Sequence, residues 1–87
     1  MTETFTLFVD PGHAWVKVPV AILQELKIAD RITRFSYLRN DVAYLEEDCD
    51  LATFVRAYRE KHGKTPHFIE RSTSRNSRIR SYSSYRS

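Results

Sequence analysis

The strongest constraint on the fold is an amphipathic pattern over residues 51–62 of this 87-residue chain. Its apolar and aromatic positions follow one face of an α-helix, at Leu51, Phe54, Val55, Tyr58 and His62. Gly63 is typical of the residue that follows a helix, and Pro66 prevents the helix from restarting. The sequence therefore predicts a long helix with one buried face.

In the segments around this helix, apolar and polar residues alternate along the chain, and this pattern predicts strands. Five strands are expected, at 4–9, 14–18, 32–38, 42–46 and 67–71. Asp10-Pro11-Gly12 and Arg39-Asn40-Asp41 supply the turns, and a short helix is expected from Pro19 to Ile28. The order β-β-α-β-β-α-β predicts an α+β fold, with one antiparallel sheet of about five strands and two helices on one face.

Charge divides the chain unevenly. The net charge is +3, yet residues 71–87 hold five arginines and no acidic residue, which leaves nine basic and eleven acidic residues in 1–70. We therefore expect a compact domain at 1–71 and a basic tail at 72–87. The tail contains seven Ser, one Thr and one Asn, and this composition favours mobility when the protein is free.

Several functional classes are disfavoured by composition. No apolar run reaches the ~20 residues that span a bilayer, and the N-terminus lacks the features of a signal peptide, so a cytoplasmic protein is expected. Cys49 is the single cysteine, and the three histidines have no metal-ligand spacing. A chain this small has little room for a deep active site. We expect a protein that is not an enzyme and uses neither a metal nor a cofactor.

The tail carries the first candidate binding residues, which combine guanidinium groups with phenol rings: Arg75, Arg78, Arg80, Tyr82, Tyr85 and Arg86. Arginine pairs with phosphate and tyrosine stacks on unpaired bases, so nucleic acid is one expected partner. A protein surface is another. The tail could also act only in solvation, or fold back onto the domain through Ile79, Tyr82 and Tyr85.

A run of carboxylates forms the second candidate, with Glu46, Glu47, Asp48 and Asp50 surrounding Cys49. Such a cluster often caps a helix, and Asp48 or Asp50 could cap the helix that follows. It could instead imitate phosphates for a basic protein partner. A calcium site is a third alternative, although the glycine and terminal glutamate of a calcium-binding loop are missing.

Three stretches together resemble a group of small phage, prophage and plasmid proteins. They are residues 10–15 (Asp-Pro-Gly-His-Ala-Trp), 44–50 (Tyr-Leu-Glu-Glu-Asp-Cys-Asp) and 77–82 (Ser-Arg-Ile-Arg-Ser-Tyr). Ala14 departs from the pattern, in which a second glycine is expected. The resemblance implies an accessory protein of a mobile element, similar in role to anti-CRISPR inhibitors, which bind host effector complexes through charged surfaces.

Two functional hypotheses follow. The first is a non-enzymatic inhibitor that binds a host nucleic-acid-processing complex of the CRISPR type in the bacterial cytoplasm, through the acidic cluster or the basic tail. The second is a small module or regulator that binds nucleic acid directly through the tail. The chain is expected to act as a monomer or a homodimer, away from any membrane.

Overall fold

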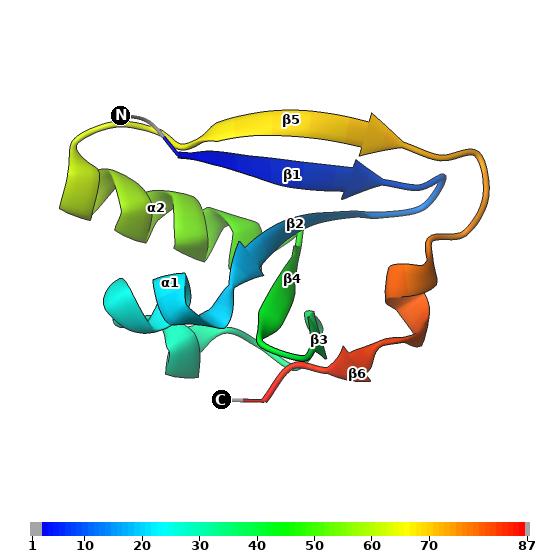
Figure 1. Ribbon diagram of the computed structural model, residues 1–87, viewed down its shortest axis with the longest axis horizontal. Coiled ribbons are helices and arrows are strands. Elements are labelled where there is room, and N and C mark those ends of the chain that lie inside the picture. Colours follow the sequence, from blue (N-terminus) through cyan, green and yellow to red (C-terminus); the bar gives the residue numbers. More distant parts are fainter. Residues whose placement is uncertain (1–2, 87) are drawn as a thin grey trace.

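The computed structural model describes residues 3–86, and these residues form an α+β fold with one sheet and two helices (Figure 1). The strands are β1 (Thr4–Val9), β2 (Ala14–Pro19), β3 (Tyr37–Arg39), β4 (Val42–Glu46), β5 (His67–Ser72) and β6 (Ser83–Ser84). The helices are α1 (Val20–Glu25) and α2 (Asp50–His62), accompanied by two 3₁₀ turns, η1 (Ala29–Arg31) and η2 (Arg78–Ser81). The predicted fold class is thus confirmed at this level.

The sheet differs from the predicted one in two respects. It is mixed rather than antiparallel, and it has six strands in the order β5-β1-β2-β4-β3-β6. Helix α2 carries the chain from the end of β4 back across the sheet, so β5 runs in the same direction as β4 and pairs parallel to β1. The sixth strand, β6, comes from the predicted tail and pairs with β3.

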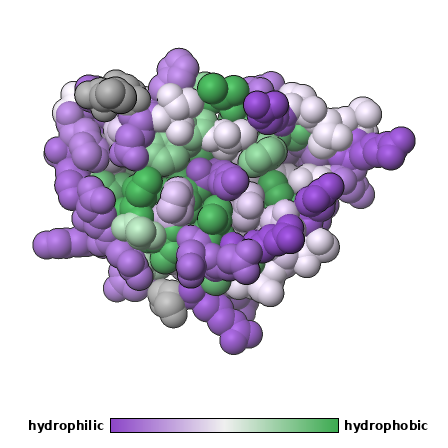
Figure 2. Space-filling view, viewed as in Figure 1, coloured by the Kyte–Doolittle hydropathy of each residue, from purple (hydrophilic) through white to green (hydrophobic). Residues whose placement is uncertain are grey.

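The main core lies between the sheet and both helices. Strand alternation turns Phe5, Val16 and Leu45 toward the helices, which contribute Leu23 from α1 and Phe54 from α2. The Phe5 and Phe54 rings meet edge to face with their centroids 5.0 Å apart. Hydrophilic residues form most of the outline of the molecule in Figure 2, with apolar residues visible between them.

The predicted hairpin is correct in its turn and too long in its first strand. Arg39 pairs with Val42 across a two-residue turn, in which Asn40 has a positive φ of 56°. Residues 32–36 leave the strand because Thr33 and Ser36 donate hydrogen bonds to Asp50 at the start of α2. A local alternation pattern does not reveal this distant partner.

The C-terminal segment, residues 73–86, covers the face of the sheet opposite the helices. Turn η2 places Ile79 against Trp15 and Tyr44, and all three side chains are buried. The chain then passes β6 and inserts Tyr85 into the main core on the helix side. Composition favoured a mobile tail, but burial of Ile79 and Tyr85 stabilises a packed segment, which Figure 1 shows as the orange and red ribbon.

Candidate functional site

A buried carboxylate holds the C-terminal segment on the sheet. Both oxygens of Asp10, at the end of β1, accept hydrogen bonds from Arg80, with the Nε–Oδ2 distance 2.7 Å and the Nη2–Oδ1 distance 2.9 Å. The main-chain N–H groups of Gly12, His13 and Ser77 donate to the same carboxylate. Residues 70 positions apart are therefore joined by a bidentate pair with further support from the backbone.

This pair explains two local features. The hydrogen bonds from Arg80, together with those from Ser77, His13 and Gly12, hold the pKa of Asp10 well below its usual range despite burial. Gly12 leaves room for the guanidinium group, because a Cβ at this position would lie 2.9 Å from Nη2 of Arg80. The turn that the sequence predicts is thus also the point where the arginine approaches the backbone.

The main candidate site is a hollow of about 510 Å³ beside η2, which we call the basic groove. Its aromatic walls are Phe8 of β1, Tyr44 of β4 and Tyr82, which is the residue that follows η2. Arg75 and Arg78 lie at its border, and both are exposed. The groove therefore combines partly buried rings with two cationic groups that extend into solvent.

The walls of the basic groove are held by contacts among the aromatic residues. The Tyr44 and Tyr82 ring centroids lie 5.1 Å apart, and burial together with the neighbouring Tyr82 raises the pKa of Tyr44. Arg39 from β3 lies over the Tyr82 ring and donates a hydrogen bond of 3.1 Å to its hydroxyl. Within residues 3–86, Arg75 and Arg78 take part in no salt bridge, so no carboxylate of these residues occupies their guanidinium groups.

The structure separates the six predicted tail residues into two anchors, three residues of the basic groove and one exposed residue that belongs to neither set. Tyr85 is buried and its hydroxyl donates a hydrogen bond to the carbonyl oxygen of Ala29, while Arg80 is engaged by Asp10. These two residues anchor the segment. Arg75, Arg78 and the partly exposed Tyr82 line the basic groove, and Arg86 is exposed beyond β6.

The acidic cluster is likewise divided. Glu46 accepts hydrogen bonds from the main-chain N–H groups of Asp48, Cys49 and Asp50, at 2.6, 2.8 and 3.0 Å. Partial burial opposes its ionisation, but these three donors prevail and lower the pKa of Glu46. The carboxylate that caps α2 is thus Glu46, not Asp48 or Asp50 as expected.

Asp50 is withdrawn from the surface, with 1% of its area exposed. Its carboxylate accepts hydrogen bonds from the N–H and hydroxyl of Thr33 and from the hydroxyl of Ser36. A partner molecule has no access to this group as the protein stands. Glu47 and Asp48 are exposed, and the Glu47 carboxylate lies 3.8 Å from Nδ1 of His13. Two of the four predicted carboxylates are therefore accessible at the surface.

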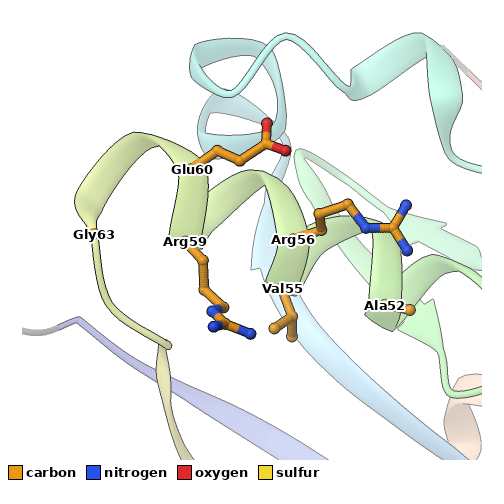
Figure 3. A pocket seen from close by; sticks show the side chains of 6 residues that line it. All are labelled: Ala52, Val55, Arg56, Arg59, Glu60 and Gly63. Carbon is orange, nitrogen blue, oxygen red and sulfur yellow. The ribbon is translucent and has the colours of Figure 1, made fainter.

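Two further hollows differ from the basic groove. One of about 440 Å³ lies on the other side of η2, with Glu46 and Asp48 at its border and the exposed ring of Phe35 beside them. The second, of about 520 Å³, follows the outer side of α2. Figure 3 shows Arg56 and Arg59 projecting from this helix, but the residues that line this hollow include no aromatic ring.

Reasoning from sequence alone missed three residues of this region. Phe8 and Tyr44 line the basic groove and Asp10 anchors the segment beside it. The sequence did contain a signal for Phe8, because β1 carries an aromatic residue on each of its two faces. Two aromatic faces indicate that residues pack against both sides of the strand. No local pattern indicated that Asp10 pairs with Arg80.

The part of the chain that the structure describes shows no group of three or more His, Cys, Asp or Glu side chains placed to hold a metal ion. Within residues 3–86, neither helix has the length and apolarity needed to cross a bilayer. No protein-family model, curated protein or solved structure matches this chain.

Proposed function

We propose that this protein binds nucleic acid, without catalysis, through the basic groove. The observation that carries the proposal is the placement of Arg75 and Arg78, two guanidinium groups free of salt bridges within residues 3–86, at the border of an aromatic hollow. Arginine recognises phosphate with paired N–H donors, and aromatic rings offer stacking surfaces to bases. The groove presents both chemistries within one site.

Anchoring of the chain on both sides of the two arginines supports this proposal. Before Arg75, the Thr73 N–H donates a hydrogen bond to the carbonyl oxygen of Val9. After Arg78, Ile79 is buried and Arg80 is bound by Asp10. A site fixed before binding loses less conformational entropy when the ligand arrives. The anchoring residues therefore serve binding indirectly, by positioning the arginines.

The test is the salt dependence of binding to a fluorescein-labelled oligonucleotide of about 12 nucleotides. Affinity should fall steeply with salt, since arginines that neutralise phosphates release counterions. Replacing both Arg75 and Arg78 by Ala should weaken binding. It should also reduce the slope of log K against log salt by about 1.4 for a single strand, because each phosphate that an arginine neutralises contributes about 0.7.

The matched control replaces Arg56 and Arg59 by Ala, which removes the same charge from the outer side of α2. This variant should keep the slope of the unmodified protein. A salt response that is flat, or one that falls equally in both double variants, contradicts binding at the basic groove.

A second candidate function is inhibition of a host nucleic-acid-processing complex, as the resemblance to phage and plasmid accessory proteins implies. The observation that favours it is the position of η2 between two unlike hollows, one bordered by Arg75 and Arg78, the other by Glu46 and Asp48. A nucleoprotein complex presents phosphates beside basic protein surface, so one face of this protein would meet both.

This second proposal predicts a stoichiometric complex with a CRISPR-type effector in the bacterial cytoplasm. The Arg75→Ala, Arg78→Ala variant and the Glu47→Gln, Asp48→Asn variant should each weaken co-purification with the effector. If only the arginine variant has an effect, and the effect disappears after nuclease treatment, direct nucleic-acid binding accounts for the association and the inhibitor function fails.

A further inference from the structure

The aromatic side of the basic groove extends onto an open part of the sheet. On the face away from the helices, Phe8 of β1 lies in register between Trp15 of β2 and Arg71 of β5. One step along, Thr6 lies between Lys17 and Ile69, and the latter is 50% exposed. The η2 segment covers β2 and β4 near Trp15 and Tyr44, whereas on the side formed by β1 and β5 Ile69 and Arg71 are exposed and Phe8 is partly exposed.

Cations surround Phe8 on this open face. Arg71, on the adjacent strand β5, is the register partner of Phe8. Arg75 and Arg78 border the hollow that Phe8 lines. All three are exposed. By strand alternation Glu46 is the one acidic residue that the strands of residues 3–86 place on this face, and its carboxylate is taken up by the start of α2. The ring of Phe8 therefore lies in a surface of positive charge.

The free-energy cost of unstacking a base favours an unpaired base over a duplex as the ligand of this site. A base within a duplex already stacks on both sides, and extracting it costs a few kcal/mol. An unpaired base meets no such cost and stacks on the accessible part of a ring, and the ring of Phe8 is partly exposed. The hollow of about 510 Å³ falls in the size range of small-molecule binding pockets, which is about 300–1,000 Å³.

The long helix, which is one kind of element that reads duplexes, lies away from the basic groove. Recognition of the major groove employs a helix or a two-stranded ribbon that projects into it. Helix α2 lies on the opposite face of the sheet, and its first turn borders the exposed carboxylates Glu47 and Asp48, which repel phosphate. A duplex would touch only the arginines.

We propose that the basic groove is selective for single-stranded nucleic acid. One unpaired base stacks on Phe8, against the wall formed by Tyr82, while Arg71, Arg75 and Arg78 hold the phosphates on either side. This inference rests on the proposed nucleic-acid function and adds to it the strandedness of the ligand and the ring that selects it.

The experiment compares a labelled thymidine strand of about 12 nucleotides with the same strand annealed to its complement, at one salt concentration. The single strand should bind roughly tenfold more tightly or better. Phe8→Leu, which keeps an apolar side chain but removes the stacking surface, should weaken single-strand binding about 5- to 100-fold, as expected when one base no longer stacks. Duplex affinity and the salt slope should not change.

Phe35→Leu is the matched control, because Phe35 is the most exposed large apolar ring and lies outside the groove. It should bind both ligands as the unmodified protein does. If Phe8→Leu fails to fold by circular dichroism, photocrosslinking of a 5-iodouracil strand to the unmodified protein decides the matter, with crosslinks expected on Phe8, Tyr44 or Tyr82.

The two proposals fail in different ways. Equal affinity for both ligands, equal weakening of both by Phe8→Leu, or crosslinks confined to α2 overturn single-strand selectivity, while nucleic-acid binding stands. Absence of binding to either ligand at low salt overturns the nucleic-acid function itself.

Discussion

The acidic cluster and the C-terminal segment look alike in sequence, since each concentrates one sign of charge, but the fold uses them differently. In the acidic cluster, Glu46 caps α2 and Asp50 is buried, so half of the carboxylates serve the structure. In the C-terminal segment, Tyr85 and Arg80 serve as anchors, and this anchoring leaves Arg75 and Arg78 displayed beside aromatic rings. Charge density by itself does not identify a binding surface, because folding uses part of the charge first.

The largest expected effect is on the anchor of the C-terminal segment. Tyr85→Ala should lower the free energy of unfolding by about 3–5 kcal/mol, because it empties a core position filled by a buried ring. Tyr85→Phe removes only the hydrogen bond to Ala29 and should cost about 1 kcal/mol. Urea denaturation measures both, and an unchanged midpoint for Tyr85→Ala contradicts the packed segment.

The next effect separates the buried carboxylate from its exposed neighbours. Asp50→Ala should lower the free energy of unfolding by about 2–4 kcal/mol, because three donors from Thr33 and Ser36 lose their acceptor. Asp48→Asn, two residues away on the surface, should change it by less than about 0.5 kcal/mol. If the two variants lose similar amounts of unfolding free energy, the distinction between the buried and the exposed carboxylates of the acidic cluster is wrong.

The smallest effect is the decline of stability in acidic solution, which tests the Asp10–Arg80 pair. The folded protein holds the pKa of Asp10 below its value in the unfolded chain, chiefly through Arg80, so the carboxylate stabilises the fold at neutral pH. This contribution decreases as pH falls below about 4, the range of an unfolded aspartate. Stability measured from about pH 6 to about pH 2 should therefore decline, and Asp10→Asn should start lower and decline less. If the stability of Asp10→Asn declines with falling pH as steeply as that of the unmodified protein, the Asp10 carboxylate does not stabilise the fold in this way.

Local patterns were sufficient where neighbouring residues determine the structure. Strand β1 spans the predicted residues 4–9, and α2 ends at His62 with Gly63 in the left-handed conformation, at φ 72°. Alternation and helical spacing depend on side chains within one or two turns of each other, so a single stretch of sequence contains the whole signal. The short turn at Asn40 follows for the same reason.

The candidate site was predictable only in part. Arg75, Arg78 and Tyr82 were identified from their spacing in the C-terminal segment, and they do line one groove. The aromatic rings on the opposite wall, Phe8 and Tyr44, come from strands far away in the sequence. Their proximity depends on sheet order and on which face each strand presents, and neither is encoded within the segment.

The amino-acid sequence alone thus establishes the amphipathic helix, the first strands and a charge difference of −2 against +5 between residues 1–70 and 71–87. Folding decides which of those charges remain available. Arg80 pairs with Asp10. The carboxylates of Glu46 and Asp50 accept hydrogen bonds from backbone N–H and hydroxyl groups. The physical reason is that a buried charge must find hydrogen-bond partners, and the tertiary structure alone determines which groups come within reach.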